Sequence, residues 1–282
     1  MPRSRHGVPP MRVTLVSLAA LAVSMVFLLP ILWMISASIR NPRQQFDVDG
    51  LGIPWIDFEP TFAAWTHELA VPRVQEGLLN STLIALGAMA LAALLGVPAA
   101  WALARQARHG NRRRSDIIAG LMLAARVVPP IVLMIPLYLM TDWVGLLDSI
   151  LPLILVNASL VLPFIIIIMR QTFLDLPVEL EEAAMLDGAP ARVVLFRIIL
   201  PVSTPALAAS ALIALAYVWN DYLFAFSFFR LELWTMPIMI TAGGGGAGGM
   251  VRTTIAIMLP AIVALVAQRY IVRGLTLGAV SK

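Results

Sequence analysis

The chain has 282 residues, of which 60% are hydrophobic and 13% are charged. A soluble domain carries roughly 45–50% apolar and about 25% charged residues, so the composition excludes an ordinary water-soluble domain and indicates a membrane protein. The net charge is +4 and there is no cysteine, which excludes disulfides, thiolate metal sites and cysteine nucleophiles. The basic residues lie in short clusters beside apolar runs, which indicates orientation in a membrane rather than binding to nucleic acid.

Apolar runs recur along the chain, and a helix needs about 20 apolar residues to cross the hydrocarbon of a bilayer. The runs are residues 13–39, 77–104, 117–141, 149–169, 198–220 and 253–268. They predict an all-α membrane protein with about six transmembrane helices. Most of the runs contain an internal proline, which can kink a helix.

The charges between the runs predict how the chain is oriented. The segments on one side are basic, with Arg3, Arg5, Arg12, Arg105, Arg108, Arg112, Arg113, Arg114, Arg269, Arg273 and Lys282. The loops on the other side are acidic or mixed, with Asp47, Asp49, Asp57, Glu59, Glu68, Glu76, Asp142 and Asp148. Because cytoplasmic loops carry an excess of Lys and Arg, both termini are predicted to lie in the cytoplasm.

Spans and charges together divide the chain into predicted segments. These are a cytoplasmic tail (1–12), a first transmembrane helix (13–39), a periplasmic loop (40–76), a core of five transmembrane helices (77–273) and a cytoplasmic tail (274–282). The first apolar run is about twice as long as that of a signal peptide, so we expect it to remain as a span. Trp55 and Trp65 in the periplasmic loop favour the membrane interface over an external partner.

The cytoplasmic loop over residues 171–201 carries a pattern of its own. Pro177 can occupy a first helical turn. Acidic residues follow near that N-terminus, where the helix dipole favours negative charge: Glu179, Glu181 and Glu182. Gly188 is placed to end the helix in a left-handed conformation, and Pro190 can begin a second helix. The loop is therefore predicted to form a short helix, a sharp turn and a helix that returns to the membrane.

This loop resembles the EAA loop of ABC importer permeases. The matching residues are Glu182, Ala183, Ala184, Asp187, Gly188 and Ala189, followed without a gap by Ile198, Leu200 and Pro201. The usual phenylalanine stands one place late, at Phe196, and Leu195 takes its position. Further matches resemble the carbohydrate branch, and most of all the smaller permease of maltose-type importers: Asn80-Ser81, Pro136-Leu137-Tyr138, Pro163-Phe164, Trp219-Asn220-Asp221 and residues 274–280.

The resemblance implies the fold of a type I ABC importer permease, with a coupling helix that docks on a cytoplasmic ATPase. The implied coupling residues are those that match the EAA motif: Glu182, Ala183, Ala184, Asp187, Gly188 and Ala189. In this reading the Glu182 carboxylate meets a basic residue of the ATPase. Ala183 and Ala184 make one thin helix face that another backbone can approach, and Gly188 provides the turn.

The resemblance also implies an assembly in the bacterial cytoplasmic (inner) membrane. The expected partners are a second, homologous permease, an ABC ATPase dimer, a periplasmic or lipid-anchored solute-binding protein and membrane lipid. The chain itself is expected to be no enzyme, to have no catalytic or metal-binding residue and to bind no cofactor. ATP and Mg²⁺ are used by the ATPase in this reading.

A few polar residues inside the runs are candidates for lining the solute pathway. Arg126 lies about nine residues into the third run, where an ionisable group is costly and often functional. The favoured alternative is a helix that starts later, with Arg126 reaching the cytoplasm or pairing with the second permease. The other candidates are Asn157, Trp219, Asn220 and Asp221, with Tyr217 and Tyr222 as aromatic neighbours suited to a sugar.

Other functions fit the sequence less well. A permease for another solute, such as glycerol phosphate, is the main alternative, because Arg126 would suit an anion. A secondary transporter usually buries several ionisable groups along its path, and this chain has few. An intramembrane serine protease needs an activating base, but the three histidines, His6, His67 and His109, lie outside the runs.

Overall fold

A computed structural model describes the backbone of residues 10–41, 52–242 and 246–279, and side chains within residues 14–268 of these ranges. Some predicted loop and tail charges lie outside the described side chains: Arg3, Arg5, Arg12, Asp47, Asp49, Arg269, Arg273 and Lys282. The described part of the chain is helical apart from turns, loops and one isolated bridge between Pro54 and Phe58. The predicted all-α fold is confirmed.

Four of the described helices are long and apolar enough to cross a membrane. They are α1 (Pro10–Ser38), α3 (Pro72–His109), α6 (Ile150–Asp175) and α13 (Ala247–Ala279). If each of two bent pairs also counts as one span, the described residues form up to six spans. The last helix begins earlier than the predicted run and continues through most of the segment that was expected to be a C-terminal tail.

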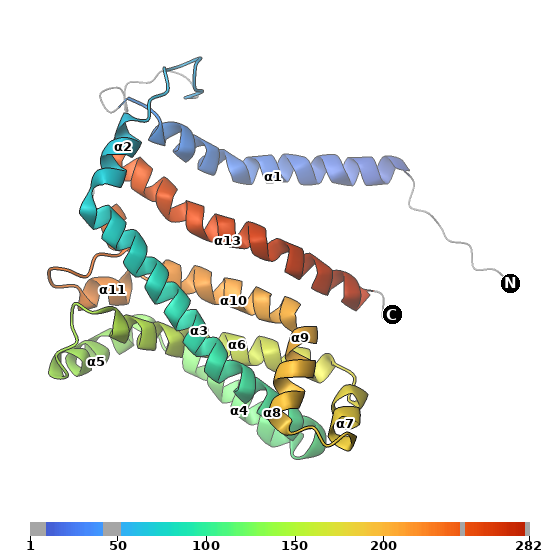
Figure 1. Ribbon diagram of the computed structural model, residues 1–282. Coiled ribbons are helices and arrows are strands. Elements are labelled where there is room, and N and C mark those ends of the chain that lie inside the picture. The colour runs from blue at the N-terminus through green and yellow to red at the C-terminus, as the bar shows by residue number, and fades with distance from the viewer. Residues whose placement is uncertain (1–9, 42–51, 243–245, 280–282) are drawn as a thin grey trace. The chain divides into compact units, whose positions relative to one another are not determined.

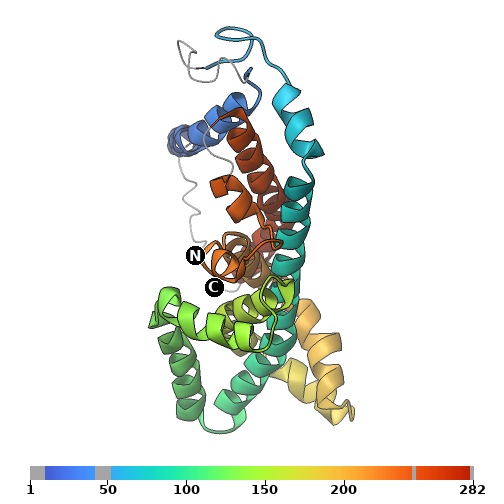
Figure 2. The ribbon, with the colours of Figure 1, turned by 90° about the vertical axis from the view of Figure 1, so that its left-hand side faces the viewer.

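The first bent pair lies in the third predicted span. Helix α4 (Arg112–Ala124) continues through a 3-10 turn, η2 (Ala125–Val127), and then meets α5 (Pro130–Trp143) at an angle of 86°. Pro129 and Pro130 account for this break, because proline lacks a backbone donor and keeps the preceding residue out of the helical region. The corner between the two green helices is visible in Figure 2.

The second bent pair follows the cytoplasmic loop. The segment Ala191–Val202 meets α10 (Thr204–Trp219) at 81°. It consists of α8 (Ala191–Val193), a π-helical stretch η3 (Val194–Ile199) and α9 (Leu200–Val202). Pro205 stands in the first turn of α10, a position that proline favours because the missing donor has no partner there.

The chain divides into two compact units, and the first takes its residues from 1–71 and 243–255. Within it, the chain after α1 folds back onto the last turn of that helix. Ser36 Oγ donates a hydrogen bond to the Gly52 carbonyl, and Trp65 Nε1 donates to Ser38 Oγ at 3.2 Å. Trp55 stays exposed at the tip of the turn with a positive φ of 64°.

A buried ion pair joins the short helix α2 (Ala63–Ala70) to the start of α13 in the same unit. Arg252 Nε lies 2.6 Å from Glu68 Oε2. Gly248 lies one turn before Arg252, and a side chain at that position would meet the Glu68 carboxylate. The glycine therefore leaves the space in which this ion pair forms.

The second unit takes its residues from 72–242 and 256–282, and its centre is the packing of α3 along α6, with α10 against both (Figure 1). Alanines on α3 are buried at this contact, which lets the helix backbones approach closely: Ala85, Ala88, Ala92, Ala100 and Ala104. Bulkier residues on α6 fill the space between them, namely Leu153, Val161, Ile165 and Ile166. This core holds the loop and the polar residues described next.

Candidate functional site

The cytoplasmic loop forms the predicted short helix, turn and returning helix. Helix α7 (Glu179–Leu186) has three acidic residues in its first turn. Gly188 lies two residues beyond its last residue and has a φ of +78°. The Gly188 N–H donates to the Met185 carbonyl and the Ala189 N–H donates to the Ala184 carbonyl, both at 3.0 Å. These two bonds form a Schellman motif, which a glycine in the left-handed conformation allows.

The two sides of α7 differ in what they face. Glu182 and Ala183 are exposed, and Leu186 is 89% exposed. Glu181 is 2% exposed and Ala184 is 8% exposed, where α7 packs against η3 of its own chain. The expectation that Ala183 and Ala184 form one accessible face therefore needs correction. Consecutive residues lie about 100° apart around a helix, and only Ala183 is open to a partner.

The other predicted coupling residues lie around the turn. Asp187 and Gly188 are exposed, and Ala189 is half-buried. Leu195, which takes the usual position of the phenylalanine, is buried, and Phe196 is about half exposed. The predicted coupling residues that are open to a partner are therefore Glu182, Ala183, Asp187 and Gly188, with Leu186 between them.

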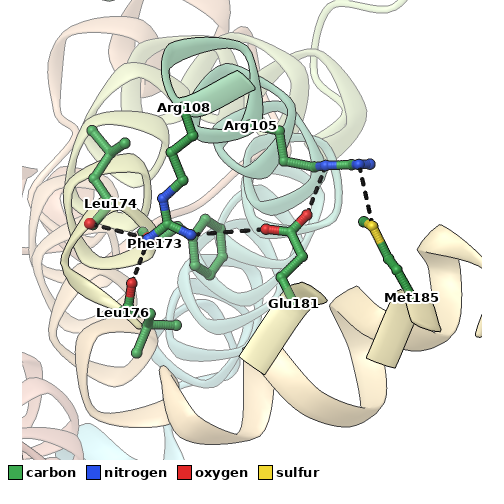
Figure 3. A network of polar contacts seen from close by, with 7 residues as sticks. All are labelled: Arg105, Arg108, Phe173, Leu174, Leu176, Glu181 and Met185. Atoms are coloured by element: carbon green, nitrogen blue, oxygen red, sulfur yellow. Dashed lines mark hydrogen bonds and ion pairs between the residues drawn. The ribbon is translucent and has the colours of Figure 1, made fainter. Parts of the chain in front are cut away.

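Glu181 lies inside a network of polar contacts that the sequence did not predict (Figure 3). Arg105 Nε is 2.7 Å from Glu181 Oε1, and Arg108 Nη1 is 3.8 Å from Glu181 Oε2. Both arginines stand in the last turns of α3. The sequence showed them only as basic residues at the end of a span. Their spacing of three residues, which places them on one helix face, is the one signal that pointed to a shared partner.

A cavity of about 430 Å³ lies in the second unit, between the break before α5 and the end of α10. It is lined by Pro130, Leu160, Tyr217, Asn220, Asp221, Tyr222, Leu223 and Phe224. Asn220 and Asp221, two of the predicted pathway residues, are among them. The lining combines aromatic rings, a carboxamide and a carboxylate, which are the groups that bind hydroxyl-rich solutes.

Arg126 lies in η2, next to this cavity. Its Nη1 donates a hydrogen bond of 2.7 Å to the Leu160 carbonyl, and its guanidinium carbon lies 4.4 Å from the Phe164 ring centre and 4.9 Å from that of Tyr217. No acidic residue in the described part of the chain forms an ion pair with it. Arg126 thus lies at the break between α4 and α5, because α4 ends at Ala124 and α5 begins at Pro130.

Asn157 and Trp219, like Arg126, are predicted pathway residues that do not line this cavity. Asn157 is buried, and its Nδ2 donates to Asp221 Oδ2 at 2.8 Å and to the Leu153 carbonyl at 3.0 Å. Trp219 is buried, with Nε1 donating to the Ala256 carbonyl at 2.8 Å. Asn157 therefore holds Asp221, which lines the cavity, whereas Trp219 joins the end of α10 to α13. Among the described residues, no three His, Asp or Glu side chains gather as metal ligands would.

Comparison with known proteins decides the family. The family model of the binding-protein-dependent transport system inner membrane component matches residues 92–277, which is more than half of the chain. The chain belongs to this family. It is therefore an integral inner-membrane component of a transport system, as the EAA motif predicted.

Members of this family are similar to the chain over nearly their whole length. The trehalose transport system permease protein SugB of Mycobacterium tuberculosis is 33% identical, over 90% of this chain and 92% of that protein. The trehalose/maltose transport system permease protein MalG of Thermococcus litoralis is 28% identical, over 94% of this chain and 95% of that protein.

A solved structure shows the same fold. A chain in the crystal structure of a bacterial ABC transporter that imports the acidic polysaccharide alginate matches with a TM-score of 0.71 and 21% identity. The match covers 95% of this chain and 99% of that one. The predicted ABC importer permease fold is confirmed.

Proposed function

We propose that this member of the family is one permease subunit of an ATP-driven importer, and that its solute is a neutral carbohydrate. The observation that carries the proposal is the lining of the 430 Å³ cavity, with Tyr217 and Tyr222 beside Asn220 and Asp221. Aromatic rings pack on the apolar faces of sugar rings, and amide and carboxylate groups bind hydroxyls. The relatives named for trehalose and for trehalose/maltose support the same class of solute.

The charges around the cavity argue against an anionic solute such as glycerol phosphate. Asp221 lines the cavity with a carboxylate, and a phosphate beside it would be repelled. Arg126 does not line the cavity; its guanidinium group bonds to a backbone carbonyl and lies over two aromatic rings. Its contribution is to hold Tyr217 in place rather than to bind an anion.

Coupling to ATP is assigned to the outward side of α7. Glu182, Ala183 and Leu186 form an exposed surface with one charge and one large apolar side chain, which suits docking on another protein. The partners in this proposal are an ABC ATPase dimer that uses ATP and Mg²⁺, a second, homologous permease, and a periplasmic or lipid-anchored solute-binding protein. The distribution of Arg and Lys supports a cytoplasmic position for both termini and for α7.

Affinity purification from native membranes, followed by transport assays on the purified complex, tests this proposal. We expect one copy of a related permease and two ATPase copies for each copy of this chain, and ATP-dependent uptake of radiolabelled trehalose or maltose into proteoliposomes. Uptake of glycerol 3-phosphate but of neither sugar would overturn the carbohydrate assignment. Uptake by the chain alone, without an ATPase, would show a secondary transporter instead.

A further inference from the structure

Glu181 stands beside the exposed Glu182 but points into its own subunit. Its side chain is almost fully buried, so water cannot solvate the carboxylate. A carboxylate in such a place is stable only when it is paired with opposite charge. Glu181 therefore cannot serve the same purpose as the glutamate that follows it.

Arg105 holds α7 by two of its residues. Besides the contact of 2.7 Å with Glu181, its Nη2 lies 3.8 Å from Met185 Sδ, one helical turn further along α7. The guanidinium also lies over the Trp101 ring, 5.0 Å from the ring centre, which fixes the arginine on α3. The last turns of α3 thus hold α7 through Arg105, whose guanidinium contacts both Trp101 on α3 and two residues of α7.

Arg108 extends the same contact to α6. Its Nη2 donates hydrogen bonds to the Phe173, Leu174 and Leu176 carbonyls at 2.5, 3.1 and 2.5 Å. The last carbonyls of a helix have no partner within the helix and favour a positive charge. Its other terminal nitrogen is the one that faces Glu181 (Figure 3). A single guanidinium group therefore meets the ends of α3, α6 and α7.

We propose that Glu181 is a positioning residue that fixes α7 to the ends of α3 and α6, so that a displacement of α7 moves both spans together. This inference rests on the proposed role of α7 as the contact with the ATPase. The chain joins α7 directly to α6 and, through the turn at Gly188, to the helices that lead into α10. The ion pairs of Glu181 add α3, which is distant in the sequence.

A distance measurement across the contact tests this directly. The chain has no cysteine, so spin labels can be placed at Glu179→Cys, the first residue of α7, and His109→Cys, the last residue of α3. The complex with a cysteine-free ATPase is measured without nucleotide and with ATP and vanadate. In the chain with Glu181 intact, we expect the same single distance without nucleotide and with ATP and vanadate. In Glu181→Gln, which keeps the shape but removes the charge, we expect the distance to shift or broaden with nucleotide.

Matched variants distinguish the loss of the ion pair from a general disturbance of the fold. In Arg105→Gln the distance should change with nucleotide as it does in Glu181→Gln. In Arg105→Lys, which keeps the positive charge, it should change little. Asp175→Asn, which alters an exposed carboxylate at the end of α6 that accepts from Gln171, should leave the distance unchanged. If Glu181→Gln does not assemble, the two Arg105 variants still decide the question.

Different outcomes would overturn different claims. A distance that changes with nucleotide as much in the unaltered chain as in Glu181→Gln would refute the positioning role. The same conclusion would follow if Arg105→Gln and Arg105→Lys behaved alike. Failure of the unaltered chain to bind any ATPase would overturn the proposed function, and with it this inference.

Discussion

Glu181 and Glu182 are consecutive residues of α7, yet the Glu181 carboxylate lies 2.7 Å from Arg105 inside the subunit and Glu182 faces outward. A helix turns by about 100° per residue, so one turn of α7 can face its own subunit on one side and a partner on the other. Substitutions at the two positions are therefore expected to have different effects.

Glu182→Lys should abolish ATP-driven uptake without affecting insertion of the chain. The side chain is exposed, so reversing its charge costs the fold little. If Glu182 meets a basic residue of the ATPase, the lysine creates a like-charge contact worth several kcal/mol, and about a tenfold or greater loss of bound ATPase is expected. Co-purification and uptake measure this, with Glu76→Lys, an exposed glutamate near the opposite end of α3, as the control. Normal uptake at normal expression would remove Glu182 from the coupling contact.

Gly188→Val should impair coupling through the backbone alone. Gly188 has a φ of +78°, and no atom lies within 4 Å of the position that a Cβ would take. A β-branched residue in the left-handed conformation costs on the order of 1–2 kcal/mol, so the turn after α7 should open. Gly188→Asn is the control, since asparagine adopts this conformation more readily. Equal ATP-driven uptake by the two variants would show that the turn can relax without consequence.

The four long helices that can cross a membrane were predictable because the thickness of the hydrocarbon sets the length of an apolar run. The residues at which the helices end were not predictable, since a helix can continue into water beyond its last apolar residue. Helix α3, Pro72–His109, is longer at both ends than the predicted run of 77–104. The bend between α4 and α5 followed from Pro129 and Pro130 as a possibility, but its angle of 86° depends on packing.

The turn at Gly188 was predictable because it depends on local conformation, whereas the buried contacts were not. Arg105 and Arg108 looked like orientation charges, because their partners Glu181 and the end of α6 lie far along the chain. Trp219 looked like a sugar-binding ring, but an apolar span does not reveal which of its faces is turned to the core.

The loop at residues 230–233 should depend on the ionised form of Asp148. The two carboxylate oxygens accept hydrogen bonds of 2.8–3.1 Å from four backbone N–H groups, those of Arg230, Leu231, Glu232 and Leu233. Partial burial alone would raise the pKa of Asp148, but the four hydrogen bonds outweigh it and lower the pKa below its usual value. The stabilisation is therefore complete above the unfolded-state pKa, about 3.9, and is lost as the pH falls through the folded-state pKa.

Pepsin cleavage at Leu231 or Leu233, followed as the pH is lowered, should rise in that acidic range. At neutral pH, Asp148→Ala should increase amide hydrogen exchange throughout the loop. Asp148→Asn should have a smaller effect, because it keeps the oxygen that accepts from Arg230 and Leu233. Equal exchange in both variants and in the unaltered chain would mean that other contacts hold the loop.

Tyr222→Ala should weaken solute recognition while leaving ATP binding by the complex unchanged. Tyr222 lines the cavity and stacks on Phe226, with ring centres 5.2 Å apart and an angle of 20° between the rings. An aromatic contact is worth about 0.5–1.5 kcal/mol, so the solute concentration for half-maximal uptake should rise about two- to tenfold. Tyr222→Phe keeps the aromatic ring and should raise the concentration for half-maximal uptake by less. Trp143→Ala removes an equally aromatic but 88% exposed side chain outside the cavity and should have no effect. If Trp143→Ala and Tyr222→Ala gave the same uptake curve, the solute would pass through the other permease and not through this cavity.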